Sequence, residues 1–339
     1  MTLFIRCNEG VCKMKKILSF FLILPVIVLS VNNCGGAPVV NVNVSNRTVF
    51  ESDDGRIVNA ALVLEGGGLR SLYSSGVLDV FMENGLEFSC VIGVSAGALN
   101  GANYIAKHIG RSARINILHS NDTNYFGIKQ FLLKGSVFNF DYLFYTPIKD
   151  LYPYAEDVFM NSKQRFLIGA TNCETGKAVY FERHTYADLV HTLQASSSIP
   201  LVSKPVNIDG LTYLDGAIAD PIGVGKAFSE GFDKVVVILT SHLEYREKKP
   251  SNLVRFLYKT VYRKHPELIT ALDNYHLLYN SLIEEINKME NENKIFVIRP
   301  SHEIKIKNLE RDARKLTDLY FLGRDDARML LPKIFEYIN

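Results

Sequence analysis

The sequence of 339 residues contains no tryptophan and only five cysteines. Five scattered cysteines are too few for a disulfide scaffold, and no two of them have the Cys-x-x-Cys spacing of a zinc site. Neither sign of charge dominates, because 38 Lys and Arg stand against 36 Asp and Glu. A dedicated nucleic-acid binder is usually more basic. We therefore expect no metal and no nucleic-acid partner, and the sequence indicates no obligate protein partner.

Long, strongly apolar runs are also scarce, and the clearest one lies near the N-terminus. The run Ile17–Val31 carries no charge and follows Lys15 and Lys16. A basic flank before an apolar run of this length is typical of a secretory signal. The run is short for a bilayer-spanning helix, which needs about 20 residues, and Pro25 interrupts it.

Cys34 comes shortly after this apolar run. The arrangement resembles a bacterial lipoprotein signal, in which lipid is attached to such a cysteine, although Asn32 and Asn33 stand where small residues usually precede it. We predict that residues 1–34 are a signal, lipoprotein-like or membrane-anchor segment, and that the protein is exported or membrane-associated. A buried helix is the alternative, and a location on the cytoplasmic face stays open.

The remaining chain has the composition of a globular protein, since hydrophobic residues make up 47% of the sequence and charged residues 22%. Residues 35–56 are polar and turn-rich and are predicted to be a linker. Further on, apolar runs that fit buried strands alternate with helical spacing. The strand-like runs are 60–64, 90–92, 165–171, 178–182, 234–240 and 294–300, and the helix-like ones are 69–84, 96–109, 251–290 and 309–337. This alternation predicts an α/β fold, a layered sheet with helices on its faces.

The segment Gly93–Gly97 reads Gly-Val-Ser-Ala-Gly and lies between a predicted strand and a predicted helix. A sharp strand-to-helix turn would lift the hydroxyl of Ser95 clear of the sheet. Gly93 and Gly97 support such a turn, because larger side chains there would collide with neighbouring backbone. The helix N-terminus behind Ser95 adds partial positive charge where an oxyanion would form. The pattern predicts a nucleophilic serine, and an idle serine at a small-residue junction is the alternative.

Three consecutive glycines, Gly66, Gly67 and Gly68, follow the first predicted strand. Such glycines leave backbone N–H groups free to bind a phosphate or a transient oxyanion. The dinucleotide fingerprint would need a glycine where Ser71 stands, and the Gly-Lys-Ser/Thr of a phosphate-binding loop is absent. Because a predicted nucleophile follows, an oxyanion hole is the better interpretation. Arg70 could support the loop or meet a substrate phosphate, and a surface arginine after a tight turn is the alternative.

Asp215 follows a strand-like stretch and precedes Gly216, which lets the backbone turn sharply. The carboxylate would then lie at a strand end, close to other strand ends of the same sheet. A carboxylate can activate a serine directly if it lies within hydrogen-bond reach and is partly desolvated. Taken alone, an Asp-Gly pair is more often an ordinary turn, and the nearby Asp209 and Asp220 look like turn residues.

In this order, the strings Gly-Gly-Gly-Leu-Arg, Gly-Val-Ser-Ala-Gly and Asp-Gly-Ala resemble the motifs of patatin-like phospholipases. The resemblance runs from about residue 59 to residue 240 and includes Ser196–Pro200, which is similar to a family segment before the aspartate. It implies a three-layer α/β/α fold with a mainly parallel central sheet, and lipid acyl hydrolysis by a Ser–Asp dyad without a cofactor. Ser95 would be the nucleophile, Asp215 the base, and the amides of Gly66–Gly68 the oxyanion hole.

On this resemblance we predict a patatin-like hydrolase domain at residues 57–240 and a mostly helical C-terminal extension at 241–339, packed on the same domain. The substrate would be a lipid or an ester. Two positions depart from the family: Ser71 stands in place of a common glycine, and Gly223 in place of a common proline. Neither belongs to the predicted dyad, so they bear on substrate preference more than on catalysis.

Three other functions stay open at this point. A Ser–His–Asp hydrolase would need a histidine after Asp215, and His242 or His302 would serve by order alone. A nucleotide-dependent oxidoreductase could use the glycine loop. A non-catalytic lipid-binding envelope protein could keep the same fold, because fold alone does not establish catalysis.

Residues 241–265 mix basic and aromatic side chains, a combination that suits an anionic membrane surface. A solvated helix packed through its apolar side is the simpler interpretation. A lid over the site is a third.

Overall fold

The computed structural model describes residues 57–144, 151–183, 188–307 and 309–339. The predicted signal or anchor segment at 1–34, with Cys34, and the predicted linker at 35–56 lie outside these residues and stay predictions. In the described ranges, no helix combines the length and the apolar character that crossing a bilayer requires.

The described part of the chain forms one eight-stranded sheet in the order β5-β6-β3-β2-β1-β7-β8, with β4 also paired to β3. Strands β3, β2, β1, β7 and β8 are parallel neighbours, whereas β4, β5 and β6 join by antiparallel pairs. The strands are β1 (Ile57–Leu64), β2 (Glu87–Val94), β3 (Arg165–Asn172), β4 (Ala178–Glu182), β5 (Val206–Ile208), β6 (Leu211–Asp215), β7 (Val235–Ile238) and β8 (Phe296–Ile298). The sheet is therefore mainly parallel at its centre, as predicted.

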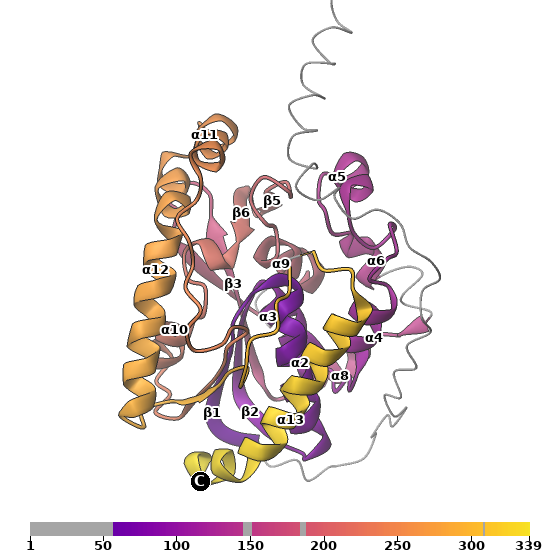
Figure 1. The fold of residues 1–339 in the computed structure, drawn as a ribbon, viewed down its shortest axis with the longest axis vertical. Coiled ribbons are helices and arrows are strands. Elements are labelled where there is room, and N and C mark those ends of the chain that lie inside the picture. The colour runs from indigo at the N-terminus through magenta and orange to yellow at the C-terminus, as the bar shows by residue number, and fades with distance from the viewer. Residues whose placement is uncertain (1–56, 145–150, 184–187, 308) are drawn as a thin grey trace, which may run out of the picture. The chain divides into compact units, whose positions relative to one another are not determined.

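Helices cover both faces of this sheet (Figure 1). The described helices are η2 (Gly68–Ser71), α2 (Leu72–Glu83), α3 (Ala96–Ile105), α4 (Arg111–Leu118), α5 (Ile128–Lys134), α6 (Phe140–Phe144), α8 (Glu156–Asn161), α9 (Leu189–Ser196), η3 (Gly216–Ile218), α10 (Val224–Ser229), α11 (Asn252–Val261), α12 (Pro266–Asn291) and α13 (Ala313–Ile338). In Figure 1, α10 and α12 lie on one side of the strands, and α2, α3 and α13 lie on the other.

Strand β1 shows why both faces must be covered. Its side chains alternate, so that Ala60, Leu62 and Leu64 join one hydrophobic cluster while Ala61 and Val63 join another. All five are fully buried. A strand that is apolar on both faces is stable only between two helical layers. The predicted three-layer α/β/α fold with a helical C-terminal region is therefore confirmed.

Two predicted helices end differently from the expectation. The helix predicted to reach residue 109 ends at Ile105, because Lys107 adopts a positive φ of 58° and turns the chain away. The helical stretch predicted at 251–290 is two helices, α11 and α12. Pro266 begins α12, and a proline disfavours helical backbone in the residue before it.

The interpretation of residues 241–265 as a helix packed through its apolar side holds only in part for α11. No residue of α11 is buried, although Tyr258 packs against a small cluster around Leu268. The side chains of Leu253, Phe256 and Val261 are 48%, 57% and 57% exposed. Helix α11 thus presents an apolar stripe outward.

Helices α2 and α13 cross in direct backbone contact because each has a glycine at the crossing. A Cβ on Gly76 would lie 2.1 Å from the carbonyl oxygen of Tyr320, and one on Gly323 would lie 2.1 Å from that of Tyr73. The buried carboxylate of Asp79 accepts a hydrogen bond from the Tyr320 hydroxyl at 2.6 Å. These contacts fix the C-terminal helix on the sheet-bearing part of the molecule.

We predict that Gly323→Ala lowers the free energy of unfolding by about 2 kcal/mol or more, because the new methyl group would overlap a backbone oxygen that cannot move cheaply. Urea denaturation would measure the change. Gly225→Ala in α10 is the matched control, since open space surrounds that position. There the change should be neutral or stabilising by up to about 1 kcal/mol. Equal stability of the two variants would contradict the close crossing.

Candidate active site

Ser95 forms the sharp turn between β2 and α3. Its backbone has φ 54° and ψ −127°, a conformation that residues other than glycine rarely adopt. Its carbonyl oxygen accepts the N–H of Ala98 at 2.9 Å, so the helix begins immediately behind it. The strand–turn–helix setting predicted for Ser95 is therefore present.

The three glycines predicted to support the site have no room for a side chain. A Cβ on Gly97 would lie 2.3 Å from the carbonyl oxygen of Leu64, and one on Gly93 would lie 2.6 Å from the backbone of α3. A Cβ on Gly216 would lie 2.3 Å from the carbonyl oxygen of Gly169. Real Cβ contacts are not this short, so each position requires glycine for the chain to pass this closely.

Asp215 ends β6, where antiparallel pairing sets it opposite Ala170 of β3. Its Oδ2 accepts a hydrogen bond of 2.6 Å from the Ser95 hydroxyl, and its Oδ1 accepts the N–H of Ala217 at 2.9 Å. Ser95 is 6% exposed and Asp215 is 5% exposed. The structure thus brings together the two residues predicted as nucleophile and base.

Burial raises the pKa of Asp215 from its ordinary value of 3.8 to about 6, although the hydrogen bonds from Ser95 and the Ala217 amide oppose the shift. A carboxylate with this pKa is ionised at neutral pH and is a stronger base than an exposed aspartate. This pair can therefore move a proton from the serine hydroxyl to the carboxylate.

Ser196 is a further residue of the site, and its role was not predicted. Its hydroxyl oxygen accepts the backbone N–H of Ser95 at 2.8 Å and donates to the carbonyl oxygen of Gly169 at 2.6 Å. It therefore ties the Ser95 turn to β3. The sequence signal was the serine-rich segment 196–198, but nothing in it distinguishes Ser196 from its neighbours.

The glycine loop lies beside Ser95. A Cβ on Gly66 would be 3.0 Å from the Ser95 Cβ and 3.8 Å from its Oγ. Gly67 and Gly68 have positive φ values of 137° and 58°. Among the described residues, the amides of Gly66, Gly67 and Gly68 donate to no protein acceptor. They are thus available to an anion next to the serine, as an oxyanion hole requires.

Residues 62–228 match the model of the family described as patatin-like phospholipase. These residues are a patatin-like phospholipase domain. A second match, to a domain of unknown function (DUF6363), covers residues 265–339, which contain α12, β8 and α13. Residues 62–228 therefore belong to a family of lipid hydrolases.

Among curated proteins, the chain is similar to the uncharacterized protein YjjU of Escherichia coli (strain K12). The two are 27% identical over 309 residues, which cover 89% of this chain and 84% of YjjU. Among solved structures, VipD from Legionella pneumophila matches with a TM-score of 0.41 and 13% identity, over 81% of this chain and 67% of VipD.

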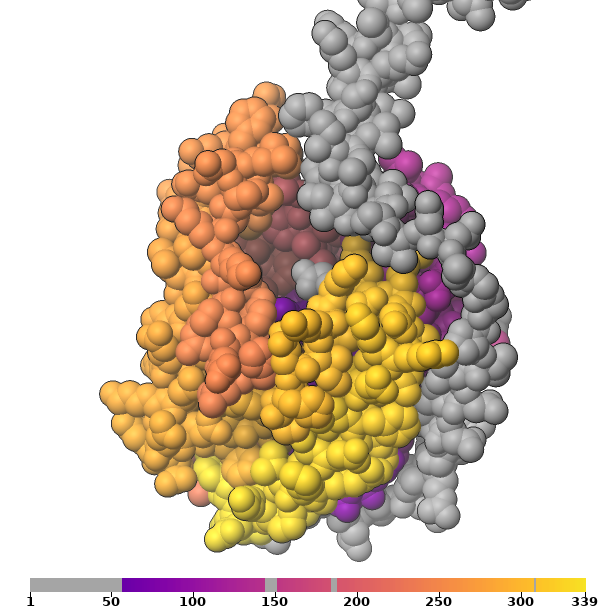
Figure 2. Space-filling model, viewed as in Figure 1, coloured from indigo at the N-terminus to yellow at the C-terminus, as the bar shows by residue number. Residues whose placement is uncertain are grey.

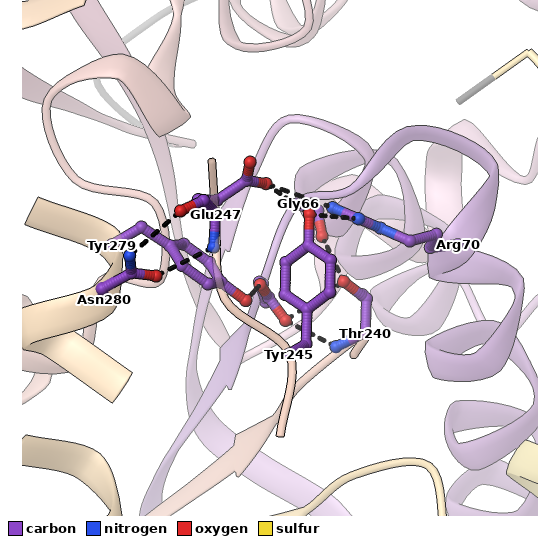
Figure 3. Close-up of polar contacts among 8 residues, drawn as sticks. Gly66, Arg70, Thr240, Tyr245, Glu247, Tyr279 and Asn280 are labelled. Atoms are coloured by element: carbon purple, nitrogen blue, oxygen red, sulfur yellow. Dashed lines mark hydrogen bonds and ion pairs between the residues drawn. The ribbon is translucent and has the colours of Figure 1, made fainter. Parts of the chain in front are cut away.

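In this patatin-like domain the residue before the glycine loop, Glu65, anchors the loop to distant elements. Its Oε2 accepts the N–H of Thr240 at 2.5 Å and the Thr240 hydroxyl at 3.1 Å, while its Oε1 accepts the Tyr279 hydroxyl at 2.8 Å. The Thr240 hydroxyl also lies 2.8 Å from the carbonyl oxygen of Gly66 (Figure 3). Burial raises the pKa of Glu65. The hydrogen bonds from Thr240 and Tyr279 and the charge of Arg70 oppose this shift. These contacts of Glu65 were not predicted from the sequence.

Arg70 turns toward the segment after β7 (Figure 3). Its Nη1 donates to the Tyr245 hydroxyl at 2.9 Å, and its guanidinium lies 4.8 Å from the centre of the Tyr245 ring. Its Nη2 lies 3.9 Å from Glu247, whose backbone exchanges two hydrogen bonds with the Asn280 side chain. Arg70 therefore couples the glycine loop to the segment 241–250 and to α12, which fits the predicted supporting role.

No histidine donates to or accepts from Ser95 or Asp215 within the described ranges. His242 and His302, the two histidines that chain order allowed for a triad, line a separate cavity together with Arg70. The geometry therefore favours a dyad of Ser95 and Asp215 over a triad.

A mainly apolar cavity of about 70 Å³ adjoins the dyad. Ser95 and Gly68 belong to its lining, together with polar residues such as Asn100 and Arg111. The apolar lining comes chiefly from Leu69, Leu99, Ile115, Phe138, Phe140 and Ile199. Such a lining suits a hydrocarbon chain attached to a reacting carbonyl group.

We predict that Asp215→Asn stabilises the protein relative to the wild type by an amount that grows with pH. The raised pKa means that the folded state disfavours the carboxylate, and this cost is absent below pH 3.8 and complete above about pH 6. The free energy of unfolding of Asp215→Asn, measured in urea relative to the wild type, should therefore rise by about 2 kcal/mol between about pH 4 and pH 8. Asp209→Asn, at an exposed turn, is the matched control. A pH-independent difference for Asp215→Asn would contradict the raised pKa.

Proposed function

We propose that the protein is a serine lipid acyl hydrolase of the phospholipase A, lysophospholipase or esterase type, with Ser95 as nucleophile and Asp215 as base. The observation that carries this proposal is the 2.6 Å hydrogen bond between the two buried side chains, at the N-terminus of α3 and beside the open amides of Gly66–Gly68. The patatin-like phospholipase match at residues 62–228 supports the same reaction class.

The first half of the reaction forms an acyl-enzyme. The Oγ of Ser95 attacks the ester carbonyl carbon while its proton passes to Asp215. Negative charge moves to the carbonyl oxygen, where the amides of Gly66–Gly68 and the positive end of α3 stabilise it. When the bond to the leaving alcohol breaks, Asp215 returns the proton to the alkoxide. The alcohol then leaves, and the fatty acyl group stays on Ser95.

The second half repeats the same proton transfers with water. Asp215 accepts a proton from water as the oxygen of that water attacks the acyl carbon. The same amides hold the second oxyanion. The acyl–oxygen bond to Ser95 then breaks, Ser95 regains its proton from Asp215, and the carboxylic acid is released.

We predict that Ser95→Ala and Asp215→Asn each lower kcat/KM for a short-chain ester about 10³-fold or more, because each removes one half of the proton-transfer pair. Wild-type kcat/KM should also fall as the pH drops below about 6, where Asp215 becomes protonated. A fluorophosphonate probe should label the wild type and spare Ser95→Ala. His242→Asn, which leaves both dyad members in place, should keep near-normal activity.

Other outcomes would point elsewhere. Near-normal turnover by Asp215→Asn would exclude the dyad. Binding to liposomes without probe labelling or ester turnover would support a non-catalytic lipid-binding protein instead.

We also propose that the enzyme meets its substrate at an anionic lipid surface through α5 and α11. Leu132 and Leu133 of α5 are 74% and 68% exposed, and Phe256 of α11 is 57% exposed. Both helices lie at the same end of the molecule in Figure 1, on either side of β5 and β6. The exposed Lys248 and Lys249 precede α11. Apolar side chains beside basic ones suit an anionic membrane surface.

We predict that Phe256→Ser and Leu132→Ser each weaken binding to phosphatidylglycerol vesicles about tenfold, since each removes a large apolar side chain from the lipid contact. Vesicle co-sedimentation would measure it. Met329 is 73% exposed but lies in α13, away from α5 and α11, so Met329→Ser should leave vesicle binding unchanged. Hydrolysis of a water-soluble ester should be the same in all three variants. Equal vesicle binding by all three would contradict the proposed surface.

A further inference from the structure

A second cavity, of about 210 Å³, lies next to the glycine loop and shares no lining residue with the cavity beside Ser95. It is enclosed by Arg70, by residues 240–242 after β7, and by residues 302–306 after β8. Figure 2 shows the molecule hollowed between the orange surface of the segment after β7 and the gold surface of the segment after β8. Its volume is ample for a small polar group and several water molecules.

Two residues that line this cavity each carry a buried hydrogen-bonding group without a partner in the described structure. One is the hydroxyl of Ser241, a residue that is only 8% exposed, and the other is the Nε–H of Arg70. Buried polar groups in folded proteins are nearly always hydrogen-bonded, because leaving one unsatisfied costs about 1–3 kcal/mol. Both groups are hydrogen-bond donors, and both residues belong to the lining of the cavity.

The charged side chains around the cavity favour an anion. Arg70 and Lys305 are cationic, and Glu303 is the acidic residue of the lining. Glu303 lies 3.9 Å from the Nε2 of His242, and its side chain is 51% exposed, so solvent screens its charge. Several donors that converge from separate segments suit a group with several acceptor oxygens.

We propose that this cavity binds a phosphate group through Arg70, Ser241 and Lys305. Arg70 directly follows the Gly66–Gly68 segment in η2, so a bound phosphate would contact the same loop that faces Ser95. The phosphate would come either from the head group of a phospholipid or from a free phosphate that binds as a separate ligand. The head-group source rests on the proposed lipid acyl hydrolase function, whereas phosphate binding itself does not.

The first experiment measures binding of inorganic phosphate to the full chain by ³¹P NMR line broadening, in the Ser95→Ala background so that catalysis plays no part. Ser241→Ala and Lys305→Gln should each weaken binding about tenfold, the loss expected for one hydrogen bond to a charged group. Lys307→Gln removes the same charge from the same segment but outside the cavity, and should bind like the parent. Because Lys305 is exposed, its substitution leaves the fold intact.

Two results would overturn the proposal. One is the absence of saturable binding at millimolar phosphate, and the other is equal affinity in Ser241→Ala, Lys305→Gln and Lys307→Gln. Neither result depends on ester turnover, so a failure of the proposed hydrolase function would be distinguishable.

A second experiment separates the two sources in the catalytically intact protein. If the cavity holds a head group, Lys305→Gln should lower kcat/KM for phosphatidylglycerol about tenfold and leave p-nitrophenyl butyrate unchanged, and inorganic phosphate should compete with the phospholipid only. If it holds free phosphate, the variant should bind phosphate weakly while its kcat/KM changes equally for the two substrates.

Discussion

The site depends on the close approach of backbone segments around one strained turn. Ser95 can hold its positive φ only because the chain passes without side chains at Gly93 and Gly97. Gly66 lets the glycine loop reach within van der Waals distance of Ser95, and Gly216 lets the turn after Asp215 pass against β3. A methyl group at any of these positions would separate the serine from one of the groups it needs.

Two buried carboxylates flank this turn, and they have different roles because their hydrogen-bond partners differ. Glu65 accepts from the Thr240 amide, the Thr240 hydroxyl and the Tyr279 hydroxyl, so its oxygens are occupied by groups that hold the loop in place. Asp215 accepts from one backbone amide and from the Ser95 hydroxyl. Of these donors, only Ser95 lines the apolar cavity beside the site, where an ester could reach it. The same burial that makes Glu65 a rigid anchor makes Asp215 a stronger base.

Much of this architecture could be predicted from local sequence. Short apolar runs located the buried strands, and the glycines around Ser95 located the turn, since both signals depend on neighbours in the chain. Asp215 was different, because an Asp-Gly pair taken alone indicates a turn, and only the order of motifs indicated a base. Its position beside Ser95 comes from the antiparallel pairing of β6 with β3.

The contacts that escaped prediction join residues far apart in sequence. Arg70 and Tyr245 are 175 positions apart, and Glu65 and Tyr279 are 214 apart. Nothing in the sequence near either partner records such a pairing. The outward-facing apolar stripe of α11 fitted only one of the three interpretations of residues 241–265, because an amphipathic pattern specifies a helix face but not what that face contacts.

The hydrogen bond from Tyr279 to Glu65 joins two stretches that separate family models describe, residues 62–228 and residues 265–339. The two stretches are therefore coupled through a buried contact. A descendant that exchanged its C-terminal segment for an unrelated one would keep the serine and the aspartate, but it would leave a buried carboxylate with one donor fewer at the base of the glycine loop. A replacement segment that anchored the loop in the same way would have to bring a hydroxyl to the same place.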